Sequence, residues 1–317
     1  MKKQIALALF LAAAAAAAPP APVIYDTDMG NDIDDALALA MLHALDARGE
    51  IRLLAVTVTK DNPWAARYVS AVNRFYGRGD IPVGMVRGGV TKDEGKYVRR
   101  VVEGGRWPHD TEFPDAAELL RRVLSAEADG GVVVIQVGFS TNLARLLDAP
   151  GGRELAARKV RLLSLMAGDF AGGGPEYNVK EDIASAQKLA AEWPGAMVWS
   201  GFEVGRKIRF PARSVERDFS WAPRHPVVDG YKLYMPFPYD RETWDLTAVL
   251  YAARPADGYF TLSEPGRVEV DARGMTRFVP APGGKHRHLM ADEVQRARAL
   301  EAMIWLASQP PRGAVRN

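Results

Sequence analysis

Short apolar runs typical of buried strands alternate along the chain with stretches whose apolar residues have helical spacing. This alternation limits the fold more than any other feature, because it is typical of a parallel sheet covered by helices. We therefore expect an α/β protein with an open, mainly parallel, Rossmann-like sheet and helices on both faces. Strands are expected at residues 23–25, 51–58, 81–86, 132–137, 160–166, 259–262, 268–270 and 277–279. Helices are expected at residues 36–45, 63–76, 116–128, 143–147, 243–253 and 291–307.

The segment 201–238 departs from this alternation. It is rich in aromatic residues, Pro and Arg, which favours strands and loops over a further strand–helix unit. No linker that would separate a second domain is visible, and 48% hydrophobic residues suit one large globular domain. We expect that domain to span residues 23–317.

The first residues have the layout of a secretory signal peptide. A basic start, Met1-Lys2-Lys3, precedes an apolar run from Ile5 to Ala18, which is shorter than the roughly 20 residues that a membrane-spanning helix needs. We expect residues 1–22 to be removed and the protein to be secreted or periplasmic; the alternative is a low-complexity terminus of a cytoplasmic protein. Without any Cys, an exported chain must rely on its core for stability. The net charge of +2 gives no argument for a nucleic-acid or membrane partner.

The turn after the first expected strand is unusually acidic. One or two Asp at a helix start are ordinary caps, but more of them repel one another and need a counter-charge. A hard divalent cation with oxygen ligands, above all Ca²⁺, supplies that charge; the alternative is a solvated acidic turn. A single Gly and the negative charge argue against a phosphate cradle. The five carboxylates belong to Asp26, Asp28, Asp32, Asp34 and Asp35.

This turn resembles the N-terminal signature D-x-D-P-G-x-D-D-A of the inosine/uridine-preferring nucleoside hydrolases. The chain has D-T-D-M-G-N-D-I-D-D-A, which is two residues longer and lacks the Pro. The resemblance implies that Asp28 and Asp35 are metal ligands, that Asp28 is also the base for the attacking water, and that Asp34 binds a ribose hydroxyl. Asp26 matches the first Asp of the signature, and Asp32 falls in the insertion without an assigned role.

Further segments resemble the same family in order along the chain. The resemblance implies a backbone carbonyl of Thr141 and a carboxylate of Asp245 for one Ca²⁺ per chain. It implies sugar or substrate contacts from Asn62, Met166, Glu176, Asn178 and Trp244. Each match also has a structural alternative: Asn62 and Thr141-Asn142 are good helix caps, and Glu176 to Asn178 follow a Gly-rich stretch typical of an exposed loop.

The resemblance implies hydrolysis of the N-glycosidic bond of a small-molecule nucleoside or riboside, giving free base and ribose. The family has a His before its last metal-binding Asp, whereas this chain has Trp244, and an indole is no general acid. His109 or His225 could replace it, Trp244 could stack on a purine, or the substrate could differ from an ordinary nucleoside. Two other functions are left open: a haloacid-dehalogenase-type phosphatase, and an exported sugar- or nucleoside-binding protein without catalysis.

The segment Arg87 to Pro114 is basic, contains aromatics and five glycines, and lacks a clear pattern. Long irregular loops are often functional, so a mobile lid is one hypothesis and a solvated basic loop is the other. Assembly as a homo-oligomer is also left open.

Overall fold

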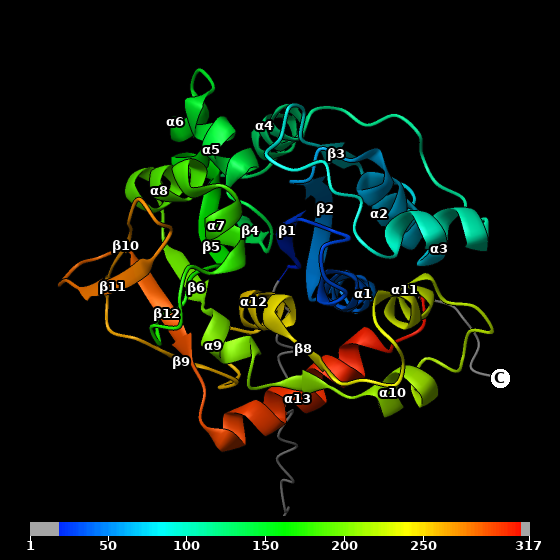
Figure 1. Cartoon of the computed structure of the whole chain (residues 1–317). Helices are drawn as coiled ribbons and strands as arrows, with labels where there is room; N and C mark the ends of the chain where they lie inside the picture. The colour runs from blue at the N-terminus through cyan, green and yellow to red at the C-terminus, as the bar shows by residue number, and fades with distance from the viewer. Residues whose placement is uncertain (1–18, 312–317) are drawn as a thin grey trace, which may run out of the picture.

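The computed structural model describes residues 19–311 and contains a large, mainly parallel sheet (Figure 1). Within these residues the ten-stranded sheet has the order β11-β10-β12-β6-β5-β4-β1-β2-β3, with β9 paired to β12. The six neighbour pairs from β12 to β3 are parallel, while β10 pairs antiparallel with both β11 and β12. The strands are β1 (Ala21–Thr27), β2 (Ile51–Val58), β3 (Val83–Met85), β4 (Val132–Gln136), β5 (Val160–Met166), β6 (Met197–Ser200), β9 (Thr261–Leu262), β10 (Gly266–Val270), β11 (Thr276–Pro280) and β12 (His286–Met290). This confirms the expected α/β fold class.

Helices cover both faces of the sheet because successive residues of its central strands point to opposite sides. Val23 and Tyr25 of β1 enter one hydrophobic core, and Ile24 enters the other. The first core includes α1 (Asp34–Ala47), α2 (Pro63–Phe75), α3 (Val98–Gly105), α11 (Pro226–Tyr234), α12 (Trp244–Ala253) and α13 (Glu293–Ala307). The second includes α4 (Ala116–Ala126), α5 (Thr141–Asp148), α6 (Gly152–Lys159) and α8 (Ile183–Glu192). The two groups lie on either side of the strands in Figure 1.

The expectation of strands and loops at 201–238 is wrong. The segment contains α9 (Phe202–Gly205), α10 (Ala212–Arg217) and α11, with only the two-residue strand β7 (Arg209–Phe210), which pairs with β8 (Arg241–Glu242). Pro226 occupies the first turn of α11, where its missing N–H costs nothing. Phe210, Phe219 and Tyr231 are buried, so the aromatics of this segment fill spaces between helices.

The segment Arg87 to Pro114 is not one continuous irregular loop, because α3 forms inside it. Val98, Val101 and Val102 of α3 are buried on α2 and α11, and irregular segments lie before and after this helix. The segment before α3 is the one that reaches the acidic turn. That loop is packed closely against the acidic turn, since a Cβ on Gly95 would lie 1.8 Å from the carbonyl oxygen of Gly30.

Residues 1–18 of the expected signal peptide lie outside the described residues, and Ala21 and Pro22 belong to β1. Among residues 19–311, no helix has the length and apolar character needed to cross a bilayer.

Candidate functional site

A pocket of about 330 Å³ lies beyond the carboxyl ends of β1, β4 and β5, where ligands bind in open parallel sheets. The acidic turn, the starts of α1 and α12, and the segments around α7 (Tyr177–Glu181) and α9 contribute its walls. The lining residues are Asp28, Asn31, Asp32, Asp34, Asp35, Val137, Met166, Glu176, Tyr177, Asn178, Phe202, Tyr234, Arg241, Trp244 and Asp245. We call this the acidic pocket.

Three carboxylates converge at the floor of the acidic pocket. One oxygen from each of Asp34, Asp35 and Asp245 lies within 4.8 Å of the others, and all three side chains are buried. The backbone N–H of Asp245 donates to Asp34 Oδ2 at 3.0 Å, and the hydroxyl of Thr27 donates to Asp35 Oδ1. The first bond joins the first turns of α12 and α1, whose N-terminal dipoles favour negative charge, and the second joins β1 to α1.

The buried carboxylates at this floor favour a bound cation. Burial, together with the charges of neighbouring aspartates, raises the pKa of Asp34, Asp35 and Asp245 well above the usual range. Burial likewise raises the pKa of Asp28 to about 7. A donor set of three buried carboxylates with free oxygens is what a hard divalent cation binds, so the residues present fit such an ion.

Lys60 is a buried cation beside this floor. Its side chain is 1% exposed, its Nζ has no hydrogen-bond acceptor among the described residues, and its nearest carboxylate oxygen in an ion pair is Asp93 Oδ2 at 3.7 Å. After burial, which raises the pKa of Asp28, the charge of Lys60 is the largest influence and lowers it. Lys60 therefore favours the ionised form of Asp28.

Asp26 is buried behind the pocket and does not line it. Its Oδ1 accepts hydrogen bonds from the hydroxyl of Thr57 at 2.6 Å and from the side-chain amide of Asn142 at 2.8 Å. Burial raises its pKa to about 7. Asp26 thus connects β1 with β2 and α5, and this contact explains its place in the acidic turn.

The residues expected on the sugar side divide into two groups. Met166, Glu176 and Asn178 line the acidic pocket, as the resemblance implied. The Glu176 carboxylate accepts from the backbone N–H groups of Gly168 and Asn178 at 3.1 and 2.9 Å. The contact with Asn178 caps the N-terminus of α7. The side-chain N–H₂ of Asn178 donates to the carbonyl oxygens of Val137 and Met166, which leaves its Oδ1 for a ligand.

Asn62 and Thr141 do not line the acidic pocket. Asn62 Oδ1 accepts from the N–H of Trp64 and caps α2, while its amide donates to the carbonyl oxygen of Lys92. The Thr141 hydroxyl donates to Asp182 Oδ2 at 2.5 Å, at the start of α5. The structure shows the capping contact of Asn62, which was the structural alternative.

Part of the pocket wall is aromatic. Trp244 stacks on Phe202 with ring centroids 5.3 Å apart, and its Nε1–H donates to the carbonyl oxygen of Phe202 at 2.9 Å. The indole N–H is therefore occupied. Asp32, in the two-residue insertion, forms a bidentate ion pair with Arg241, whose Nε lies 2.9 Å from Asp32 Oδ1.

None of the five histidines, all within the described residues, lines the acidic pocket. His225 is buried among aromatic rings and caps α11 through Nδ1, and burial lowers its pKa to about 3. His109 contacts the carbonyl oxygen of Trp107 through Nδ1. Neither His that could have replaced the missing proton donor is placed to do so.

Sequence reasoning missed several lining residues. Tyr177 reaches across the mouth, where its hydroxyl donates to Asn31 Oδ1 at 3.2 Å. Phe202, Tyr234 and Arg241 come from the segment in which only strands and loops were expected or from just after it. The signal available for Arg241 was its position three residues before the recognised Trp244-Asp245 pair.

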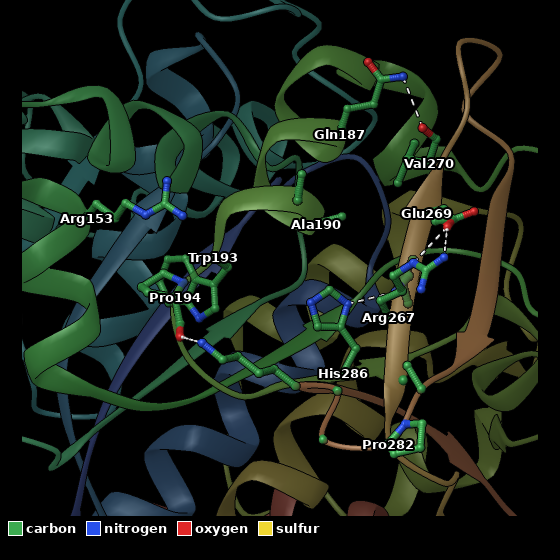
Figure 2. Close-up of a pocket in the computed structure, with 17 residues that line it drawn as sticks. Arg153, Gln187, Ala190, Trp193, Pro194, Arg267, Glu269, Val270, Pro282 and His286 are labelled. Carbon is green, nitrogen blue, oxygen red and sulfur yellow. Dashed lines mark hydrogen bonds and ion pairs between the residues drawn. The ribbon is translucent and has the colours of Figure 1, made fainter.

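A second, larger hollow of about 720 Å³ lies between α8 and the β10–β11 hairpin (Figure 2). Its lining includes Trp193, Pro194, Arg267, Glu269 and His286, and it lies at the antiparallel end of the sheet. We call it the hairpin groove. No cluster of metal-binding side chains was found there among the described residues.

The fold is that of nucleoside hydrolases. The chain matches a plant nucleoside hydrolase, PpNRh1, with a TM-score of 0.71, 20% identity, and coverage of 92% of this chain and 100% of the other. It matches an inosine-uridine preferring nucleoside hydrolase from Bacillus anthracis with a TM-score of 0.72, 17% identity, and coverage of 91% and 99%. A purine-preferring ribonucleoside hydrolase from Gardnerella vaginalis matches with a TM-score of 0.71, 17% identity, and coverage of 90% and 99%. A comparison with curated proteins found no match.

The family follows from a match over most of the sequence. The model of the inosine-uridine preferring nucleoside hydrolases matches residues 23–301, so the chain belongs to that family. It is therefore a hydrolase that acts on N-glycosyl bonds of small-molecule nucleosides. Family membership removes the phosphatase alternative, and Asp26, its required nucleophile, does not line the pocket.

Proposed function

We propose that the protein hydrolyses the N-glycosidic bond of a ribonucleoside or a related N-riboside and that it requires one Ca²⁺ per chain. The observation that carries the proposal is the convergence of three buried carboxylate oxygens beneath a pocket that Asp28 also lines. Its volume of about 330 Å³ falls within the range of small-molecule sites.

Ca²⁺ suits the site better than a smaller ion. It accepts six to eight oxygens in flexible geometry, whereas Mg²⁺ demands a near-ideal octahedron. Asp34, Asp35 and Asp245 would hold the ion with hydroxyl oxygens of the sugar, and Asp28 lies on the same wall. When bound, the ion would supply charge that lowers the pKa of a water molecule and orients the sugar.

The side chains of the pocket support the remaining roles. Asp28 would remove a proton from the attacking water, and the neighbouring carboxylates would favour the positive charge that develops on the ribose. Glu176 and Asn178 would orient sugar hydroxyls, with Asn178 Oδ1 available as an acceptor. Trp244 and Phe202 offer a stacked apolar surface for the base.

The test is hydrolysis of a panel of purine and pyrimidine ribonucleosides, followed by chromatography of the free base and an assay of reducing sugar. We expect turnover that EDTA abolishes and that Ca²⁺ restores, with one ion per chain by calorimetry. Asp245→Asn should weaken Ca²⁺ binding at least tenfold because one of three carboxylates is lost, while Asp271→Asn in the hairpin turn should leave it unchanged. Nucleoside binding without turnover by the Ca²⁺-loaded protein would overturn the proposal.

We further propose that residues 1–22 direct export. A fusion of these residues to a reporter that folds only outside the cytoplasm should be active, and the same fusion with Leu7, Leu9 and Leu11 replaced by Asp should not, because the charges interrupt the apolar run. An inactive unaltered fusion would contradict export.

A further inference from the structure

Arg241 is the only basic side chain among the residues that line the acidic pocket. Its guanidinium lies over the ring of Tyr234 at 5.2 Å and over that of Trp244 at 5.1 Å. It therefore belongs to the aromatic part of the wall, with Tyr234 and Trp244. A guanidinium keeps its charge at any pH at which a protein is folded.

The guanidinium is held in a fixed orientation. Asp32 accepts from Nε and Nη2, Tyr234 Oη accepts from Nη2 at 3.3 Å, and Glu242 accepts from Nη1 at 3.1 Å. Of its five N–H donors, the one that remains, on Nη1, has no acceptor among the described residues. The insertion in the acidic turn thus supplies the carboxylate that orients Arg241.

Carboxylates pair with Arg241, and its guanidinium keeps its positive charge in these ion pairs. Glu242 also pairs with Arg209 at 2.9 Å, so Asp32, Arg241, Glu242 and Arg209 form an alternating chain of two anions and two cations. Arg209 is mostly exposed and does not line the pocket. Fixed dipoles and charges of this kind stabilise a developing charge without reorganisation.

Among the lining residues of the aromatic wall, the hydroxyl group belongs to Tyr234, and burial raises its pKa, so it is a poor proton donor for a departing base. Trp244 Nε1 is occupied by the carbonyl oxygen of Phe202, and the histidines lie elsewhere. A base that leaves without a proton carries the electron pair of the broken bond as negative charge. The one cation on the aromatic wall is then the group able to receive that charge.

We propose that Arg241 stabilises the departing base as an anion, which deepens and rests on the proposed hydrolysis. The C1′–N bond breaks and its electron pair goes to the base nitrogen, whose ring faces the Arg241 N–H. Water adds its oxygen to C1′ and gives one proton to Asp28. The base anion later takes a proton from solvent, and Asp28 releases its own, so that one water is consumed.

This mechanism selects a class of substrate. Oxo-substituted heterocycles of the hypoxanthine or uracil type leave as anions more readily than amino-substituted ones, and their oxygens accept from a guanidinium. An amino group at the same position would bring its own N–H donor against the N–H donor of Arg241.

The test compares Arg241→Ala and Arg241→Lys with Arg209→Ala, which removes the other arginine of the same ion-pair chain. The substrates are inosine and 4-nitrophenyl β-D-ribofuranoside, whose leaving group is acidic enough to depart without help. Arg241→Ala should lower kcat for inosine by about 10²–10³-fold, the usual cost of losing one preorganised donor. It should lower kcat for the nitrophenyl riboside by less than about tenfold, and Arg241→Lys should recover part of the loss. Arg209→Ala should change neither substrate by more than about twofold.

Equal losses on both substrates would show a structural role and overturn the inference. So would a wild-type kcat for inosine that falls above neutral pH with a single ionisation below pH 9, because that would reveal a proton donor. Thermal unfolding and Ca²⁺ affinity of Arg241→Lys check that the site is intact. If the wild-type protein hydrolyses neither substrate, the proposed function itself fails; if it hydrolyses both and Arg241→Ala is unimpaired, only this inference fails.

Discussion

The acidic pocket and the hairpin groove are hollows of opposite chemistry. The groove has about twice the volume, 720 Å³ against 330 Å³, yet several of its polar groups are paired with one another, and its unpaired buried group among the described residues, the indole N–H of Trp193, carries no charge. Lys285 donates to the carbonyl oxygen of Pro194, Gln187 to that of Val270, and His286 Nδ1 accepts from the N–H of Val268 (Figure 2). The pocket holds buried carboxylates that nothing in the described chain neutralises fully.

The comparison shows that buried charge without a counter-charge distinguishes the candidate functional site, whereas the volume of a hollow does not. Burying an unpaired carboxylate costs free energy, so it persists only where a ligand or reaction uses it. The groove holds no comparable cluster of buried carboxylates among the described residues, so its volume alone gives no reason to assign it a function. Four matched pairs of substitutions, one in or beside each hollow, test that contrast.

The largest expected effect comes from replacing a carboxylate with its amide in each region. Asp28→Asn should lower kcat for the nucleoside by about 10²–10⁴-fold, because a positioned general base contributes that much. Glu269→Gln in the groove, where Arg267 and Arg277 pair with the carboxylate at the surface, should leave kcat within about twofold. Steady-state kinetics decides; Asp28→Asn with more than a tenth of normal activity would contradict the assigned base.

The second effect is on stability against pH in the metal-free protein. Asp26 has its pKa raised by burial from 3.8 to about 7, so between these values the unfolded chain releases a proton that the folded protein keeps. The free energy of unfolding should therefore fall as pH rises from 5 to 8, by about 3 kcal/mol for this group. Asp26→Asn should reduce the slope.

The control lies in the hairpin turn. Backbone N–H groups of Met275 and Arg273 lower the pKa of Asp271, which is ionised in both states over this range, so Asp271→Asn should leave the slope unchanged. Urea unfolding in EDTA at each pH measures the free energy of unfolding and hence its slope against pH. Stability that rises from pH 5 to 8 would refute the assignment.

The third effect concerns the loop on the acidic turn. Gly95 and Gly283 have φ of +77° and +73°, but a Cβ on Gly95 would meet the Gly30 carbonyl at 1.8 Å, whereas one on Gly283 would meet nothing within 4 Å. Both Ala variants lose about 1 kcal/mol from the backbone conformation. Gly95→Ala should also push the loop from the acidic turn and raise KM about tenfold, while Gly283→Ala keeps KM. Equal kinetics in the two variants would separate the loop from the site.

The smallest effect is a shift in a pH profile. Lys60→Met removes the cation that lowers the pKa of Asp28, so the acid limb of kcat/KM should move to higher pH because Asp28 acts in its ionised form. At pH 8 we expect a loss of less than about tenfold. Lys285→Met, which removes an exposed contact with Pro194, should leave the limb in place. A shift to lower pH in Lys60→Met would contradict the role of this lysine.

The parts of the fold that sequence predicts best are strands buried on both faces. Ile51–Val58 and Val160–Met166 are mostly apolar runs, each interrupted by one Arg and one hydroxyl residue, and both match the observed strands. Strand β6 was missed because it has only four residues after Trp193-Pro194-Gly195, and β12 because its His and Arg residues hide the pattern. The helices of 201–238 are short; α10 follows Pro211, α11 begins at Pro226, and α9 follows a Gly, and composition alone favours loops at such residues.

The site was predictable where motifs are local and hidden where contacts are distant. The acidic turn, Glu176, Asn178 and Trp244-Asp245 follow from short segments that the structure brings into one pocket. The pairing of Asp32 with Arg241 joins residues 209 positions apart, and no spacing rule connects them. Asn62 shows the reverse error, because its sequence context suits both a sugar contact and the helix cap that it forms.

The hydrogen bond from Asp245 to Asp34 has a consequence for the synthesis and folding of the protein. It joins residues 211 positions apart, so a growing chain has displayed Asp34 and Asp35 long before Asp245 exists. All three carboxylates can chelate one ion only after α12 has been synthesised and has docked beside α1. Capture of the proposed ion would then be a late step of maturation, and protection from proteolysis by Ca²⁺ should appear only in chains that extend past residue 253.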